Sequence, residues 1–296
     1  MLASLLTDRS ESVEVDGSML DIDLQAPEWP GHMEALLGEL KQLRKYNALL
    51  ENRQAEMEAE LSRAERVQQS LAPRSLVWND VSVETYYSPA HTIGGDFGIV
   101  FPHNDEALTI LMCDISGHGI GSALMANRVY SEALNQLERE TTPDYLLRHL
   151  HDFAHARLAT HGFYLTMAAV RFSMRGRRAA FAAGGHPPAM HVSSSGVRLC
   201  ESQNGILGCF LKSGPSALAD QIELSPGDRL VLYTDGLIEV FNDFDDMLGV
   251  EGLKGLVLES YQLPIHECKQ AILDGVRRWG HGPLADDVSL VIVELR

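Results

Sequence analysis

The stretch LTILMCDISGHG, residues 108–119, joins an apolar run to a glycine-rich turn. The run over residues 108–115 predicts a strand that is buried inside a sheet. Asp114 lies near the end of this strand, where the glycines that follow allow the backbone to approach a ligand closely. Because an isolated charge is unfavourable at such a partly buried place, Asp114 is expected to be paired or to bind a metal ion.

Three further aspartates share this context. Asp96 lies in GGDFG (94–98), Asp235 follows an apolar run in YTDG (233–236), and Asp286 precedes one in DDVSL (286–290). Hard divalent cations prefer several oxygen ligands, and two such ions about 3.5–4 Å apart can generate hydroxide and hold a phosphoryl group during in-line attack. A single Asp-Gly is more simply a turn residue that caps local backbone. Four aspartates at strand ends favour a metal site, provided that the fold brings them together.

Residues 73–296 are predicted to form an α+β domain with antiparallel sheets and helices outside them, because strands come in runs and do not alternate strictly with helices. The predicted strands are 81–87, 108–115, 165–173, 179–183, 189–192, 197–200, 221–224, 228–233 and 288–295. The predicted helices are 121–138, 143–158, 251–259 and 265–279.

Two segments precede this domain. Residues 1–30 are acidic and aperiodic and are predicted to be a tail or linker. Residues 31–72 carry a heptad repeat, which predicts a coiled-coil helix in a parallel homodimer. The alternative is a long amphipathic helix folded back on its own domain. The d positions are Leu36, Leu43, Leu50, Met57, Ala64 and Leu71, and the a positions are Leu40, Asn47, Gln54, Leu61 and Gln68.

The composition narrows the classes of function. The formal net charge of -17 disfavours binding to nucleic acids and to anionic membranes. The chain has 4 cysteines without CxxC spacing, so neither a disulfide framework nor a thiolate metal site is indicated. No signal peptide and no apolar run of about 20 residues is visible in the sequence. These features predict a cytoplasmic protein.

Five motifs in this order resemble the PPM (type-2C) metal-dependent protein phosphatases, in their SpoIIE/RsbU-like bacterial branch. The motifs are GGDF (94–97), DISGHG (114–119), GGHPPAM (184–190), YTDGLIE (233–239) and DDVSL (286–290). The segment AERVQQSLAP (64–73) is similar to the helix that precedes the domain in this branch, so the resemblance covers about residues 64–296.

The resemblance implies a central antiparallel β-sandwich flanked by helices, in the order α-β-β-α, with two Mn²⁺ or Mg²⁺ ions at one end. It implies that the ions are held by Asp96, Asp114, Asp235, Asp286 and the backbone carbonyl of Ile115. A metal-bridging hydroxide would then hydrolyse phosphoserine or phosphothreonine without a covalent phosphoenzyme.

The resemblance also implies partners. The substrate would be a phosphoprotein such as an anti-sigma-factor antagonist in a partner-switching pathway. We expect an upstream sensor or receiver that regulates the enzyme to lie outside this sequence, because residues 1–30 are too short to form one. Because the heptads run directly into the domain, we expect dimerisation or rotation of the helix to position the metal-binding elements.

The sequence departs from the family pattern at three positions. Gly98 and Ile99 stand where the first motif often has an aromatic residue and a second aspartate, and Ile99 cannot bind metal. Ala183 replaces an asparagine that usually precedes the third motif.

Two histidines lie within the motifs. His118 could be a general acid but is interpreted as a helix-start residue facing solvent. His186, before two prolines, is interpreted as structural.

Three other functions remain open at this point. GGDF also occurs in nucleotide cyclases, which need a further acidic residue that is missing here. GHGIG resembles a glycine-rich nucleotide loop of ATPases, although a lone run of this kind is weak evidence. Neither explains Asp235 and Asp286. The third is a non-catalytic coiled-coil scaffold with a degenerate phosphatase domain, and Ile99 is its best support.

Overall fold

The computed structural model describes residues 12–15, 18–21, 29–70, 72–103, 106–139, 141–173, 177–209, 215, 218–280, 282 and 285–296. Its internal contacts divide the chain into two units, Met1–Glu60 and Leu61–Arg296. The sequence-based boundaries at residues 30 and 72 remain predictions. In the described part of the chain, none of the helices combines the length and the hydropathy needed to cross a lipid bilayer.

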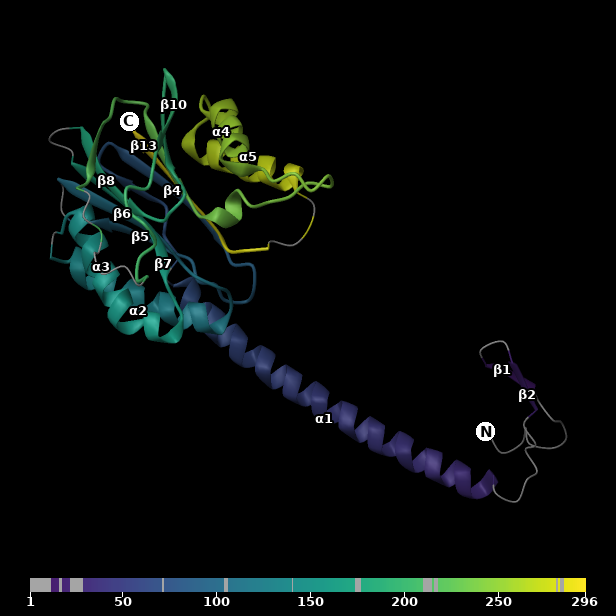
Figure 1. Ribbon diagram of the computed structural model, residues 1–296. Helices are drawn as coiled ribbons and strands as arrows, with labels where there is room; N and C mark the ends of the chain where they lie inside the picture. The colour runs from purple at the N-terminus through teal and green to yellow at the C-terminus, as the bar shows by residue number, and fades with distance from the viewer. Residues whose placement is uncertain are drawn as a thin grey trace. The chain divides into compact units, whose positions relative to one another are not determined.

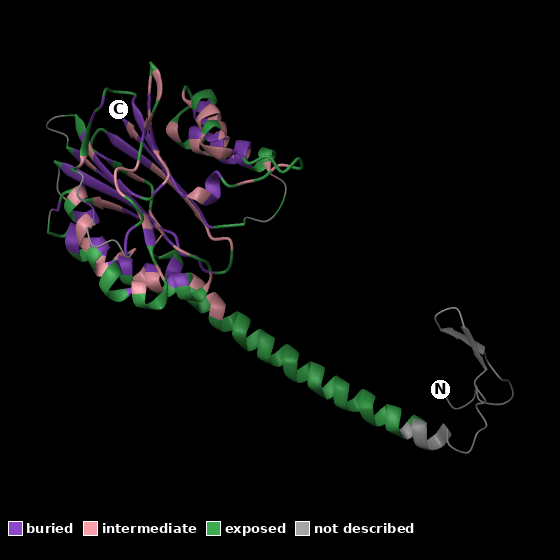
Figure 2. Cartoon of the chain, viewed as in Figure 1, coloured by how far each residue is buried: buried purple, intermediate pink, exposed green. Residues whose placement is uncertain are grey.

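The first unit contains two short strands and most of a long helix. Strands β1 (Ser12–Val15) and β2 (Ser18–Asp21) pair antiparallel, which the aperiodic acidic composition did not predict. Helix α1 (Trp29–Gln69) covers nearly all of the predicted heptad segment. Its predicted a and d side chains are largely exposed, for example Leu36 at 52% and Leu43 at 57% (Figure 2).

The second unit is built on two antiparallel sheets. The six-stranded sheet has the order β10 (Gly196–Cys200), β9 (Ala189–Ser193), β12 (Arg229–Tyr233), β13 (Val288–Leu295), β4 (Val81–Ser88) and β3 (Leu76–Trp78). The five-stranded sheet has the order β11 (Asp220–Glu223), β8 (Arg178–Gly184), β7 (Leu165–Ser173), β6 (Ala107–Ile115) and β5 (Phe97–Pro102).

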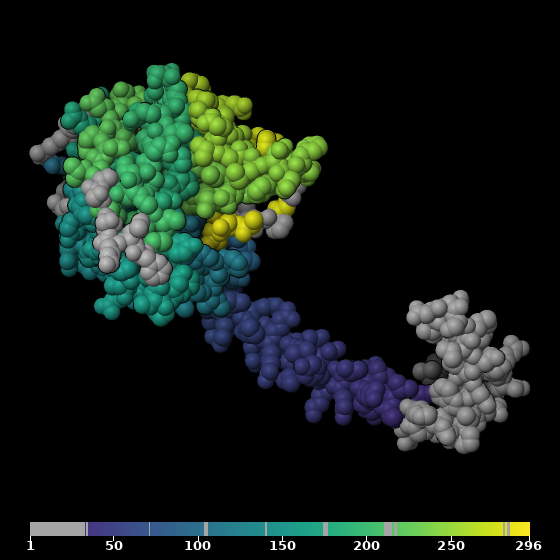
Figure 3. Space-filling model, viewed as in Figure 1, coloured from purple at the N-terminus to yellow at the C-terminus, as the bar shows by residue number. Residues whose placement is uncertain are grey.

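Helices cover the outer face of each sheet. Helices α2 (Ile120–Leu137) and α3 (Pro143–Arg157) pack on the five-stranded sheet, and α4 (Gly249–Ser260) and α5 (Ile265–Trp279) pack on the six-stranded one (Figure 1). The teal surface that includes α2 and α3 and the yellow-green surface that includes α4 and α5 lie on opposite sides of this unit (Figure 3). The described part of this unit also contains 3₁₀ turns at Ala159–His161 and Asp235–Leu237. The predicted α+β class, with a helix-flanked antiparallel sandwich preceded by a helix, is confirmed.

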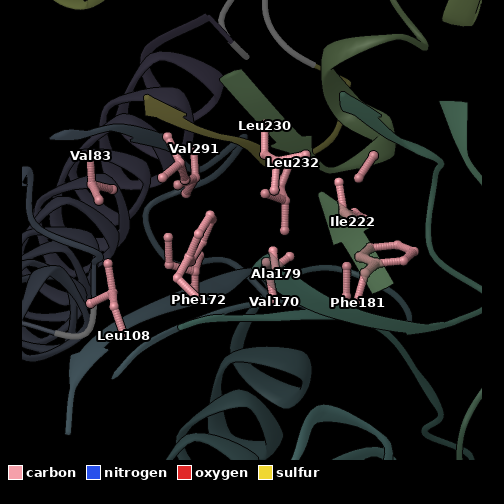
Figure 4. Close-up of a cluster of buried hydrophobic side chains, with 14 of the residues drawn as sticks. Val83, Leu108, Val170, Phe172, Ala179, Phe181, Ile222, Leu230, Leu232 and Val291 are labelled. Carbon is pink, nitrogen blue, oxygen red and sulfur yellow. The ribbon is translucent and has the colours of Figure 1, made fainter. Parts of the chain in front are cut away.

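Strand β6 explains why residues 108–115 are apolar without alternation. The side chain of Leu108 points into the layer between the two sheets (Figure 4), and Ile110 and Met112 belong to the same buried cluster. Leu111 and Cys113 point to the other side, under α2 and α3. A strand that is buried on both faces is apolar at most positions, because neither face meets water.

Strand β5 was missed by the sequence analysis for a physical reason. It contains Gly98 and ends in Pro102, both of which are unfavourable inside a sheet. The structure places it at the edge of the five-stranded sheet, where a proline is tolerated.

Candidate metal centre

Each sheet brings two of the four predicted aspartates to the same end of the sandwich. In the five-stranded sheet, Phe97 pairs with Cys113, so Asp96 and Asp114 lie next to each other. In the six-stranded sheet, Tyr233 pairs with Leu290, so the end of β12 and the start of β13 meet there. Asp235 lies two residues after β12, and Asp286 lies two residues before β13.

The layer between the sheets changes from apolar to polar at this end. Along β6, the inward side chains are Leu108, Ile110 and Met112, so the alternation of a strand turns Asp114 inward as well. The same alternation along β12 turns Thr234 inward after Leu230 and Leu232. The site is therefore the polar end of an otherwise apolar core.

The electrostatics show that the carboxylates are near one another. Burial and, after it, the charges of Asp235, Asp286 and Asp287 together raise the pKa of Asp114 from 3.8 to about 7. Burial, followed by the charge of Asp114, raises the pKa of Asp96 well above its ordinary value. Burial and the charge of Asp286 also raise the pKa of Asp235. No basic residue is among the groups that shift these three pKa values.

Asp96 is held by two hydroxyl groups from the opposite sheet. Thr234 Oγ1 and Ser289 Oγ donate to its Oδ2 over 2.7 and 2.8 Å. The backbone N–H of Ser289 in turn donates to Thr234 Oγ1 over 2.9 Å. The sequence analysis quoted both residues within motifs but gave them no role, because which sheet end faces which is a property of the folded sandwich.

Asp287 organises the loop that carries the first motif. Its buried carboxylate accepts hydrogen bonds from the backbone N–H groups of Ala90 at 2.8 Å and Gly95 at 2.6 Å, with a longer one from Asp96 at 3.4 Å. A Cβ atom on Gly94 would lie only 2.1 Å from Oδ2 of Asp287. The second aspartate of DDVSL therefore positions the backbone around Asp96, a role that the sequence analysis did not assign.

The last turn of α1 contacts the same loop. Gly94 donates its N–H to Gln68 Oε1 over 2.9 Å, and Gln68 Nε2 donates to the carbonyl of Gly94. Gln68, predicted as position a of the coiled coil, is buried, and its amide binds this domain. The coiled coil itself stays a prediction. Leu71, the last predicted d position, lies outside the described residues.

The remaining predicted residues are placed as follows. The carbonyl oxygen of Ile115 points to Gly95, where a Cβ atom would lie 2.7 Å from it. Ile99 is buried in the core under α2 and α3, on the side of β5 away from the aspartates. His118 is exposed, as predicted, and its ring lies 5.0 Å from that of His91.

Gly98 has a structural reason for its departure from the family pattern. A Cβ atom there would lie 2.9 Å from Cγ of Pro73, which leaves no room for an aromatic side chain. The connection after α1 thus lies against β5 at this glycine.

The donors fit divalent cations that prefer oxygen ligands. They are carboxylates and one backbone carbonyl, and the carboxylates repel one another, with no basic residue of the described chain among the causes of the pKa shifts of Asp96 and Asp114. Among the described residues, no group of three or more His, Cys, Asp or Glu side chains is already closed around one point. The aspartates gather at one end of the sandwich, and their assignment as ligands is a proposal.

The raised pKa of Asp114 predicts a pH dependence for the metal-free protein. Between about pH 4 and pH 7 the folded state holds a proton that the unfolded chain has released, so stability falls as the pH rises. Urea unfolding of the wild type and of Asp114→Asn across this range measures the effect. The variant should show a smaller decrease with pH, and equal slopes for both proteins would contradict the prediction.

The helix-flanked sandwich with aspartates at one end defines the class of PP2C-type phosphatase domains, and comparison with known proteins agrees. The chain belongs to the SpoIIE family, whose model, "Stage II sporulation protein E (SpoIIE)", matches residues 104–296. The resemblance inferred from the motifs is thus confirmed.

Individual proteins are similar at lower identity. The phosphoserine phosphatase RsbP of Bacillus subtilis (strain 168) is 25% identical over 246 residues, which cover 80% of this chain and 58% of RsbP. The SiaA-PP2C domain of Pseudomonas aeruginosa superposes with a TM-score of 0.73 at 19% identity. The match covers 82% of this chain and 98% of the SiaA domain. The catalytic domain of PstP, solved with 2 manganese ions, superposes with a TM-score of 0.52 at 16% identity. This match covers 72% of this chain and 97% of the PstP domain. This chain spans less than two thirds of RsbP.

Proposed function

We propose that this protein is a metal-dependent serine/threonine phosphatase that acts on a phosphorylated regulatory protein. The observation that carries the proposal is the meeting of Asp96 and Asp114 from one sheet with Asp235 and Asp286 from the other at one end of the sandwich. Burial and the nearby charges of Asp235 and Asp286 raise the pKa of Asp114 to about 7. A phosphoserine phosphatase among its relatives supports the reaction class.

Asp96, Asp114, Asp235, Asp286 and the carbonyl of Ile115 would hold two Mn²⁺ or Mg²⁺ ions. The PstP domain with 2 manganese ions supports this assignment. Such ions, when bound, supply a nucleophilic hydroxide at neutral pH and neutralise charge on the phosphoryl group. Their positive charge would also offset the burial and the carboxylate repulsion that raise the pKa of Asp114 to about 7.

The protein's own groups prepare this site. The hydroxyls of Thr234 and Ser289 occupy Oδ2 of Asp96 and fix its orientation. Asp287 fixes the backbone N–H groups of the loop that carries Asp96. Preorganised ligands need not rearrange when an ion or a phosphoryl group arrives.

The scaffold alternative loses its main support. Ile99 lies in the core under α2 and α3, so its apolar side chain takes no ligand away from the aspartates. The cyclase and ATPase alternatives leave Asp235 and Asp286 without a role.

A phosphate-release assay tests the proposal. With a phosphoserine peptide or p-nitrophenyl phosphate, we expect release that requires Mn²⁺ or Mg²⁺ and stops with a chelator. Calorimetry with GTP and ATP should show no binding. Absence of hydrolysis with every divalent metal would favour the scaffold, and tight nucleotide binding would favour a cyclase or ATPase.

For the partners, we propose an anti-sigma-factor antagonist as substrate, an upstream sensor or receiver, and action in the cytoplasm. A homodimer through α1 is supported by its exposed leucines at heptad positions. Sedimentation equilibrium of the full chain should give twice the monomer mass, and a monomer at micromolar concentration would refute the dimer.

We further propose that α1 regulates the site through its last turn. The paired hydrogen bonds between Gln68 and Gly94 connect the helix to the loop that carries Asp96. A truncated chain that begins at Pro73 should differ from the full chain in rate or in regulation. If both behave alike, this proposal fails.

Replacing Gln68 with alanine tests the same contact with one side chain. The variant leaves the N–H and the carbonyl of Gly94 without their partner, so we expect it to lose about 1–3 kcal/mol of stability and severalfold in the rate of phosphate release. Gln69→Ala is the matched control, because the Gln69 side chain is exposed and donates to Glu65 in its own helix. Urea unfolding and the phosphate-release assay measure both effects, and identical behaviour of the two variants would refute the role of Gln68.

A further inference from the structure

The chain crosses from one sheet to the other at His186. Strand β8 ends at Gly184 in the five-stranded sheet, and β9 begins at Ala189 in the six-stranded sheet. Gly185 has φ of 63°, which favours glycine, and a Cβ atom on it would lie 2.7 Å from Cγ1 of Ile206. The glycine turn before His186 and the two prolines after it restrict the backbone of this crossover.

The imidazole of His186 lies between strands that carry metal-centre residues. Its Nδ1 is 2.9 Å from Oγ1 of Thr166. Thr166 lies directly opposite Asp114 in the pairing of β6 and β7, so their side chains are on the same face of the sheet. Toward the other sheet, the chain after His186 enters β9, which pairs with β12, the strand that precedes Asp235.

The histidine is buried and neutral. Only 4% of its surface is exposed, and burial lowers its pKa to about 3. A neutral imidazole has one N–H donor and one acceptor nitrogen, on opposite sides of the ring. Its Nε2 has no hydrogen-bond partner within the described part of the chain. Mere filling of the core would need no such polar ring at this place.

We propose that His186 is a positioning residue that sets the spacing between the two sheets at the metal centre, and with it the relation of Asp114 to Asp235. It acts through its contact with Thr166 on one sheet and through β9, which pairs with β12, on the other. The inference rests on the proposed two-ion centre and adds a residue that does not itself bind metal.

Titration of the full-length protein with Mn²⁺ by calorimetry, without substrate, tests this role. We expect His186→Ala and Thr166→Val each to weaken Mn²⁺ binding by about tenfold, as loss of a residue that orients metal ligands typically does. His186→Asn places an amide where Nδ1 lies, so it should retain the contact with Thr166 and bind Mn²⁺ within about threefold of the wild type. In the double variant His186→Ala/Thr166→Val the two losses should be less than additive, because they remove the same contact.

His191→Ala is the matched control. His191 lies in β9, and its side chain is also largely buried. It bonds Asp228 over 2.9 Å, away from the four aspartates of the metal centre. We expect this variant to lose thermal stability but to keep the Mn²⁺ affinity of the wild type. A purely structural His186 would behave in the same way.

The outcomes separate the two proposals. Wild-type Mn²⁺ affinity in both His186→Ala and Thr166→Val, or fully additive losses in the double variant, would overturn the positioning role. If His186→Ala does not fold, Thr166→Val and His186→Asn still decide. Because the titration contains no substrate, a wild type that binds Mn²⁺ but hydrolyses no phosphoester would refute the phosphatase function alone.

Discussion

Replacing Asp114 with asparagine is expected to reduce the rate of phosphate release about a thousandfold, because the change removes one charged ligand where two ions would stabilise the transition state. Asparagine keeps the shape of the side chain, so the fold should persist. The metal-free variant should even unfold at higher urea than the wild type near neutral pH, since burial and the charges of Asp235 and Asp286 disfavour the ionised carboxyl. Both effects can be measured on the same preparation.

Asp228→Asn provides the comparison. Asp228 is buried and lies at the opposite end of β12 from Asp235, where it bonds His191. We expect this variant to lose stability and to retain its catalytic rate. If Asp114→Asn kept more than about a tenth of the wild-type rate, corresponding to a loss of less than about 1.4 kcal/mol, Asp114 would not be a ligand essential for catalysis.

Replacing Gly94 with alanine should have the second largest effect. The new methyl group would meet the carboxylate of Asp287 at 2.1 Å, and that carboxylate is held by the N–H groups of Ala90 and Gly95. Relieving the collision must break one or both hydrogen bonds, so we expect a loss of about 2–4 kcal/mol of stability. The rate of phosphate release should fall at least tenfold, because the loop also carries Asp96.

Gly255→Ala is the control for this substitution. Gly255 lies in α4, and a Cβ atom there would meet nothing within 4 Å. Alanine is favoured over glycine in a helix by about 1 kcal/mol, so this variant should be as stable as the wild type or more stable. Urea unfolding of both variants, together with the phosphate-release assay, gives the comparison. A Gly94→Ala protein as stable and active as Gly255→Ala would contradict the geometry of the loop.

The sequence alone predicted the residues whose role follows from their immediate neighbours in the chain. Asp114 and Asp235 border apolar runs that could only be strands, and a carboxylate in such a place calls for a partner. The layered α+β fold followed from the order of strands and helices. The family resemblance then supplied the sandwich and the proposed ligands.

The supporting residues could not be predicted because their partners come from distant parts of the chain. Ser289 and Thr234 reach Asp96 only when the two sheets face each other. Gln68 stands at a heptad position in the sequence, yet in the structure its amide forms hydrogen bonds with the backbone of Gly94. Periodicity describes which face of a helix a residue occupies, and it does not tell what that face meets.

The double coverage of β6 has a kinetic consequence. Amide hydrogens of residues 108–113 are shielded by hydrophobic layers on both sides, so they should exchange with solvent only when the whole domain opens. The strand that carries Asp114 is therefore expected to stay in place during the local fluctuations that loosen surface loops. Exchange measurements should find it among the slowest segments of the chain.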